Sequence, residues 1–170
     1  MTGFRLDKGG LINRRRKIKF RYNGQEITGF KGDTIASALM ASGHMLVGRS
    51  FKYHRPRGIM SAGVEEGGAL FNTGDGAARI PNVKGTVTEI SEGLRVYSQN
   101  VFPSPEFDLG AVNGLIAPFI TAGFYYKTFM GPFANTKFWM LCEHFIRRAA
   151  GLGRASREAD PSAYDIANGF

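Results

Sequence analysis

The sequence predicts an α+β fold in which short antiparallel strands surround one helix and a second helix follows toward the C-terminus. Three observations carry this prediction. Residues 17–22 alternate polar and apolar side chains and run into Asn23-Gly24, a pair typical of a tight hairpin turn. Apolar residues then recur at helical spacing between 34 and 42, and residues 84–97 alternate again around a second turn.

The first hairpin follows an arm of residues 1–13, which has several glycines and no apolar period. We interpret this arm as flexible and expect the domain to begin at residue 14. Ile18, Phe20 and Tyr22 share one face of the first strand, because successive side chains of a strand point to opposite faces. Residues 26–30 form the returning strand.

The helix of residues 34–42 is expected to begin at Asp33 or Thr34, since both side chains can accept hydrogen bonds from its first free N–H groups. Gly43 suits the left-handed conformation that ends many helices. One face of this helix is apolar through Ile35, Ala38 and Leu39.

The remaining strands complete the domain. Residues 48–68 combine glycine with positive charge and lack a period, which predicts a loop. A short strand is expected over 69–72, and residues 84–90 and 94–97 are expected to pair as a second hairpin around Glu92-Gly93. This element order over residues 14–100 predicts a β-grasp domain.

Beyond residue 100 the composition changes. Residues 101–133 are rich in Phe and Tyr and contain four prolines, so we expect this connecting segment to pack on something. A helix is expected over 136–150, and together these form a region of residues 101–153. Residues 154–170 are polar and aperiodic, which predicts a tail or linker.

The charge of +8 is concentrated at one end of the chain. Residues 1–60 carry 13 Lys and Arg against 3 Asp and Glu, whereas residues 61–170 carry 9 against 11. This imbalance indicates a local anionic partner. No apolar run is long enough to span a membrane and no signal peptide is evident, so we expect a cytoplasmic protein without a membrane partner.

A basic loop is the main candidate binding site. Lys52, His54, Arg55 and Arg57 surround a proline, and such a loop could clamp a cofactor phosphate or pair with acidic groups of a neighbouring domain or subunit. Both alternatives stay open at this point. Residues 14–17 are also basic, but alternate faces of a strand cannot form one continuous nucleic-acid stripe.

The sequence offers no catalytic or metal-ligating set. There is no G-x-G-x-x-G after a strand, no Walker loop and no nucleophile with a matching base. Cys142 is the single cysteine, which excludes an internal disulfide and a cysteine-held metal centre built from this chain alone. We therefore expect no catalytic residues and no bound metal here.

Three stretches resemble one known family. Residues 48–70 read GRSFKYHRPRGIMSAGVEEGGAL, residues 98–100 and 107–130 read SQN and FDLGAVNGLIAPFITAGFYYKTFM, and residues 145–153 read FIRRAAGLG. This pattern resembles the amino-terminal region of the α subunit of heterotetrameric sarcosine oxidase. In that family the region is similar to a [2Fe–2S] ferredoxin-type β-grasp domain.

The resemblance also implies that the cluster is missing. A plant-type cluster loop needs Cys-x₄-Cys-x₂-Cys and a fourth, separate cysteine. That spacing falls on Ser61, Glu66 and Ala69, with Ser98 as our choice for the fourth position. None of these residues supplies a thiolate, so we expect a ferredoxin-like domain without its cluster.

By resemblance, the complete complex is a flavoenzyme that oxidatively demethylates sarcosine or a related secondary or tertiary amine, using FAD, FMN, NAD and tetrahydrofolate. The resemblance assigns these cofactors to the remaining α-subunit domains and to the other subunits, and implies an accessory, structural role for this chain. We expect this chain alone to hold none of the cofactors and to be inactive. The alternative is an autonomous basic nucleic-acid-binding module, which rests only on the charge of residues 1–60.

Overall fold

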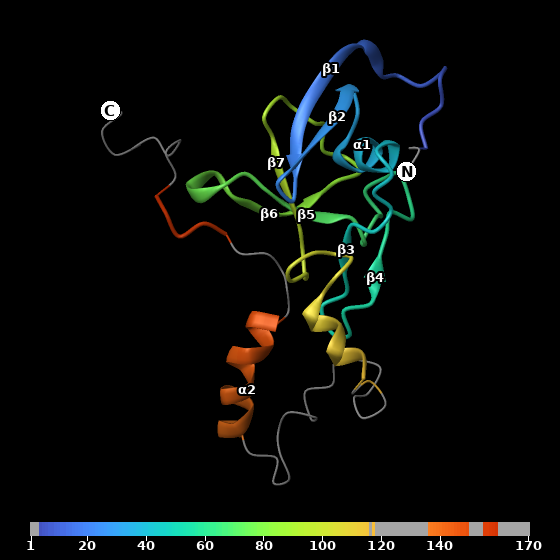
Figure 1. Ribbon diagram of the computed structural model, residues 1–170. Helices are drawn as coiled ribbons and strands as arrows, with labels where there is room; N and C mark the ends of the chain where they lie inside the picture. The colour runs from blue at the N-terminus through green and yellow to red at the C-terminus, as the bar shows by residue number, and fades with distance from the viewer. Residues whose placement is uncertain (1–3, 116, 118–135, 150–154, 160–170) are drawn as a thin grey trace, which may run out of the picture.

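The structure is a computed structural model that describes residues 4–115, 117, 136–149 and 155–159. Its centre is a mixed five-stranded sheet in the order β2-β1-β7-β5-β6, seen in Figure 1. The strands of this sheet are β1 (Asn13–Tyr22), β2 (Gln25–Lys31), β5 (Leu70–Thr73), β6 (Ile80–Lys84) and β7 (Arg95–Ser98). Strands β1 and β7 pair in parallel near the centre of the sheet, and the other neighbouring strands pair antiparallel. The α+β, β-grasp prediction is thus confirmed.

The other described elements are short, apart from one helix. A two-stranded ribbon joins the segments before and after the basic loop, and two 3-10 turns follow later in the chain. These elements are α1 (Ile35–Ala41), β3 (Gly48–Arg49), β4 (Pro56–Arg57), η1 (Gly76–Ala78), η2 (Leu109–Gly114) and α2 (Thr136–Ala149).

The first hairpin forms as predicted. Asn23 and Gly24 have φ values of 48° and 85°, the paired positive angles of a type I′ turn, whose twist matches that of the strands. Ile18, Phe20 and Tyr22 are buried, whereas most residues between them are exposed. The alternation read from the sequence therefore places one face of β1 in the core.

Helix α1 is also where the sequence predicts it. The Thr34 hydroxyl accepts a hydrogen bond from the Ser37 N–H, and the Ser37 hydroxyl accepts one from the Thr34 N–H. Gly43 has a φ of +86° just after the helix. The core formed between α1 and the sheet consists of Ile18, Phe20, Tyr22, Ile27, Ile35, Ala38, Leu39, Val47, Ala69, Phe71, Ile90 and Val96.

The second predicted hairpin is wrong. Residues 80–84 form the strand, which pairs with β5, and residues 85–90 leave the sheet. The reason lies at the start of α1, where free N–H groups need acceptors. Ile35 N–H donates to the Thr88 carbonyl and Ala36 N–H donates to the Gly85 carbonyl, so this segment covers the helix end instead of continuing the sheet.

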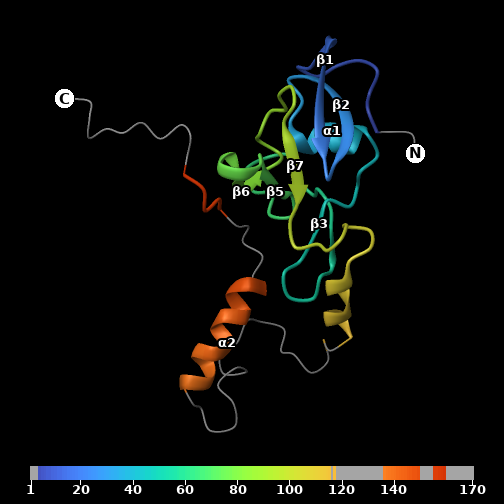
Figure 2. The ribbon, with the colours of Figure 1, turned by 60° about the vertical axis from the view of Figure 1, so that its left-hand side comes forward.

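Two outer parts of the chain are described only partly. The arm contacts the domain through Arg5, whose guanidinium donates to both oxygens of Asp33 and lies 4.9 Å from the Phe30 ring centroid. Helix α2 lies apart from the sheet in Figures 1 and 2. In the segment predicted over 101–133, residues 116 and 118–133 lie outside the described residues. Among the described helices none is both long and apolar enough to cross a membrane.

Candidate functional site

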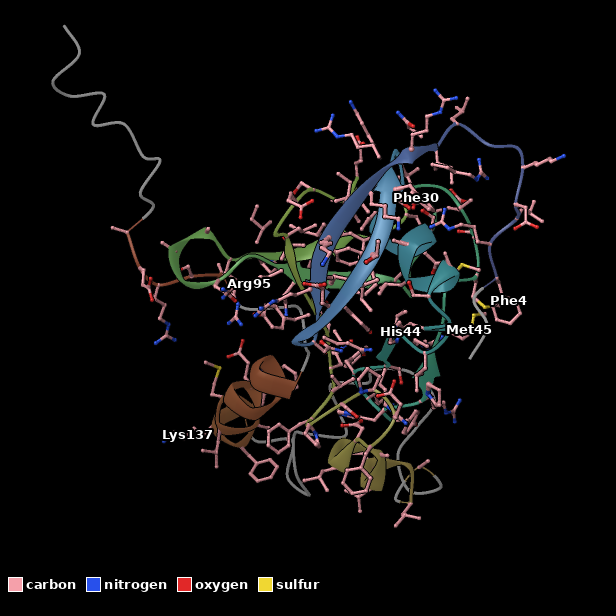
Figure 3. The ribbon with its side chains drawn as sticks, turned by 45° about the horizontal axis from the view of Figure 1, so that its top comes forward. Phe4, Phe30, His44, Met45, Arg95 and Lys137 are labelled. Carbon is pink, nitrogen blue, oxygen red and sulfur yellow. The ribbon has the colours of Figure 1, made fainter. Side chains whose placement is uncertain are left out.

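An open cleft of about 920 Å³ lies beside the β3–β4 ribbon. His44 and Met45, which follow the end of α1 and precede β3, lie on the side of the molecule where this ribbon begins (Figure 3). One wall is the loop of residues 48–58, and residues 66–68 form part of the other. The carboxamide side chains of Asn82, Gln99 and Asn100 contribute to the lining.

Three of the four predicted binding residues line this cleft. The Lys52 ammonium lies 5.0 Å from the Tyr53 ring centroid, and the Arg55 guanidinium lies 4.9 Å from the same ring. Arg57 is exposed on β4. The loop thus places two cations, Lys52 and Arg55, beside one aromatic ring and a third, Arg57, in the lining of the same cleft, an arrangement that favours an anionic ligand or partner.

The fourth residue, His54, contacts a buried carboxylate. Its Nδ1 lies 2.6 Å from Oδ2 of Asp108, whose side chain is 1% exposed. An ionised carboxylate only accepts hydrogen bonds, so Nδ1 carries the proton. At Gly110 an added Cβ would stand 2.2 Å from the His54 ring, which shows how closely η2 packs on it. The structure therefore uses His54 to hold the loop against residues 108–110.

Arg49 also takes part in this contact, and its role is not predicted from the sequence. Its guanidinium donates to the carbonyls of Pro105 and His54, at 2.8 and 2.9 Å. Burial alone would raise the pKa of Asp108, but backbone N–H donors and the His54 ring hold it below its ordinary value. No local spacing could reveal the cluster, because Asp108 and His54 are 54 positions apart in the chain.

The loop with cluster spacing has a different chemistry from a cluster site. Ser61 is half-buried, Ala69 is fully buried, and Glu66 is only 4% exposed. The Ser98 hydroxyl bonds the Tyr22 hydroxyl and the Asn23 side chain, at 2.7 and 2.9 Å. A hydroxyl, a carboxylate and a methyl group cannot replace three thiolates, so the residues present do not fit a [2Fe–2S] cluster. Within the described part of the chain there is no group of three candidate metal ligands.

Several large apolar side chains are exposed on and around the cleft. Among the described residues, large apolar side chains that are 44% to 89% exposed gather in the segments that form or adjoin the basic loop. They are Phe51, Met60, Val64, Phe102, Phe107, Leu109 and Val112. Such clustering on a protein surface is typical of an interaction site.

The remaining candidates have ordinary surroundings. Arg15, Arg16 and Lys17 are exposed at the start of β1, where nitrogen-tipped side chains point outward in several directions (Figure 3). His44 packs edge-on against Tyr22, with ring centroids 5.4 Å apart. Cys142 is a half-buried free thiol on α2.

Comparisons with known proteins match this chain to one family and to two homologous subunits. Residues 15–101 match the family described as "2Fe-2S iron-sulfur cluster binding domain". The chain is homologous to sarcosine oxidase subunit alpha of Rhizobium meliloti, with 55% identity over 166 residues, and to that of Corynebacterium sp. strain U-96, with 47% identity over 66 residues. These matches cover 97% and 39% of this chain.

The chain spans only 16% and 7% of the length of these two relatives. Among solved structures, L-proline dehydrogenase from P. horikoshii matches with a TM-score of 0.40 and 17% identity, over 51% of this chain and 16% of that chain. A likeness this weak carries no argument.

Proposed function

The chain belongs to the family of 2Fe-2S iron-sulfur cluster binding domains, and we propose that it is an accessory domain of a sarcosine oxidase alpha-like subunit. The observation that carries the proposal is the 55% identity to such a subunit over 97% of the chain. The complete flavoenzyme complex would oxidatively demethylate sarcosine or a related secondary or tertiary amine in the cytoplasm. FAD, FMN, NAD and tetrahydrofolate would be held by the remaining α-subunit domains and the other subunits.

In this proposal residues 14–100 form the docking domain, and residues 101–153 lead to its partners. The cleft supports this role because three cations, Lys52, Arg55 and Arg57, stand beside exposed apolar side chains. A partner surface that brings carboxylates, or a cofactor phosphate held by a neighbouring domain, would neutralise these cations. His54 would act as a positioning residue, since its contact with Asp108 fixes the backbone of the loop.

A chimera tests the proposal. This chain would replace the matched 166 residues in the α subunit of the Rhizobium meliloti enzyme. We expect the complex to assemble and to consume oxygen with sarcosine, and we expect the isolated 170-residue chain, given FAD and FMN, to consume none. Failure of the chimera to assemble, or turnover by the isolated chain, would contradict the proposal.

The cleft has its own test within that chimera. Arg55→Ala and Arg57→Ala together should weaken assembly or lower the flavin content, because losing a charge from a desolvated contact costs about 2 to 5 kcal/mol. Arg15→Ala is the matched control, since Arg15 is an exposed arginine on β1. If the double variant assembles and loads flavin as the control does, the cleft is not the docking site.

The nucleic-acid alternative has no specific support in the described residues. Single-strand binders combine a continuous basic groove with stacking aromatic side chains. Here Arg14 donates to the Leu6 carbonyl and Lys19 pairs with Glu26, so the basic strand is partly engaged by the chain itself. Oligonucleotide binding that survives physiological salt would restore this alternative.

A further inference from the structure

Glu66 is a buried carboxylate at the middle position of the cluster spacing. Both of its oxygens accept hydrogen bonds from the backbone of its own loop: Oε2 accepts from the N–H groups of Met60 and Ser61, at 2.6 and 2.7 Å, and Oε1 accepts from Gly68 N–H at 2.5 Å. Three backbone donors from two different segments of the loop thus converge on one side chain. The loop closes around this carboxylate.

Convergent backbone N–H groups form a concave anion site, and iron–sulfur clusters often sit in such sites. The cluster is itself an anion, held by thiolates and by hydrogen bonds to its sulfur atoms. In this chain a carboxylate receives the N–H groups of Met60, Ser61 and Gly68, one from a cluster-spacing position and two beside such positions. The loop therefore offers the donors that suit a buried anion, and the protein supplies that anion itself.

Hydrogen bonds from neighbouring residues also hold the rest of this loop in place. The Thr86 hydroxyl donates to the Gly63 carbonyl at 2.8 Å, and the Lys84 ammonium donates to the Val64 carbonyl at 2.5 Å. On the other side, a Cβ added at Gly68 would stand 2.8 Å from the Gly58 carbonyl oxygen. The loop packs between the end of the basic loop and the chain around β6.

We propose that the Glu66 carboxylate takes the place of the iron–sulfur cluster as the anion around which residues 60–69 fold, so that this domain keeps the scaffold of its family without depending on iron. The domain then carries no electrons. This proposal is independent of the amine-oxidising complex proposed above, because it rests on the hydrogen bonds within the loop.

The protonation state of Glu66 agrees with this role. Burial alone would raise the pKa of its carboxyl, but the N–H groups of Gly68, Ser61 and Met60 outweigh burial and lower the pKa below the ordinary value. The carboxylate is therefore the form that the loop binds. A neutral side chain of the same shape should not replace it.

Glu66→Gln tests this requirement directly. Both oxygens of Glu66 accept from N–H donors, so either orientation of a glutamine amide sets its NH₂ group against at least one of them. In the 170-residue chain, we expect hydrogen exchange of the Met60, Ser61 and Gly68 amides to accelerate at least about tenfold, since a buried donor loses a charged acceptor.

The matched control is Glu65→Gln, because Glu65 is the adjacent carboxylate of the same loop and is exposed. It should leave the three amides unchanged, and the core amides of Phe20 and Val96 report whether each variant remains folded. Treatment of the unchanged protein with an iron chelator should alter none of these rates. Unfolding of the core in Glu66→Gln but not in Glu65→Gln would also support the proposal. The proposal is overturned if Glu66→Gln exchanges like Glu65→Gln, or if the chelator alone opens the loop.

Discussion

The sheet with α1 and the loop region, which we define as residues 48–68 and 99–114, are built in opposite ways. In the first, the buried side chains are almost all apolar, as in Phe20, Leu39 and Phe71. In the second, the buried side chains include Glu66, Gln99 and Asp108, whereas large apolar side chains face outward. A region with polar groups inside and apolar groups outside is stabilised by hydrogen bonds, and its exposed apolar surface is typical of an interaction site.

This difference explains why His54, one of the predicted binding residues, instead contacts a buried carboxylate of its own chain. Arg49 and His54 have the side chains that bind anions, and both meet a buried carboxylate of their own chain, Asp108. The exposed cations Arg55 and Arg57 remain in the lining of the cleft. Residue type alone therefore does not separate a binding group from a group that holds the loop in place.

The largest effect should come from the apolar core. Phe71→Ala removes a fully buried ring on β5, an inner strand of the sheet, and should lower the free energy of unfolding by about 3 to 5 kcal/mol. Phe102→Ala is the control from the loop region, because that ring is 68% exposed and should change stability little. Urea unfolding of both variants measures the comparison, and equal losses would show that the loop region also buries apolar side chains.

Asp108→Ala should be the most damaging change in the loop region. It leaves the Arg49 guanidinium and the His54 ring without their buried partner, a loss of about 3 kcal/mol. Glu106→Ala is the matched control, since Glu106 is an exposed acid two positions away. If both variants unfold at the same urea concentration, the Asp108 contact does not hold the region together.

Acid should weaken the chain through the same carboxylate. The folded pKa of Asp108 lies below the unfolded value of about 3.9, so its contribution is complete above that pH and is lost as the pH falls toward the folded pKa. Asp33 behaves alike: burial would raise its pKa, but the Arg5 guanidinium, the Phe30 N–H and the Ser37 hydroxyl lower it. We expect the free energy of unfolding to fall below about pH 4, and less steeply in Asp108→Ala. An unchanged slope in that variant would contradict this assignment.

The sequence predicts the apolar half far better than the loop region. The alternation around Phe20, the Asn23-Gly24 turn and the Thr34 cap are local patterns whose physical cause lies within a few residues. The wrong hairpin over 84–97 shows the limit, because Gly85 and Thr88 are drawn out of the sheet by the N–H groups of a distant helix.

In the loop region the decisive contacts are not local. Cluster spacing identifies Glu66 as a position that lacks its cysteine, but not as the acceptor of three backbone N–H groups. Asp108 joins segments far apart in the chain and has no motif of its own. The basic residues of the cleft can be identified from the sequence because their charge is clustered there. The position of the Tyr53 ring beside both Lys52 and Arg55 cannot.

The smallest of these effects should come from the polar contact that starts α1. Thr34→Ala removes the side-chain acceptor of the Ser37 N–H and should cost about 1 kcal/mol. The cost stays small because the first two N–H groups of the helix still donate to the segment of residues 85–88. Thr34→Ser, which keeps the hydroxyl, is the control in thermal unfolding. A loss as large as that of Phe71→Ala would mean that the cap supports the whole sheet.

The central claim is that a cluster-binding scaffold is held together here by the protein's own charges. Anaerobic reconstitution of the 170-residue chain with iron and sulfide, followed by visible spectroscopy and iron analysis, tests it most directly. We predict no [2Fe–2S] chromophore and less than one equivalent of iron, because Ser61, Glu66 and Ala69 supply no thiolate. A stable chromophore with about two iron atoms per chain would contradict the account.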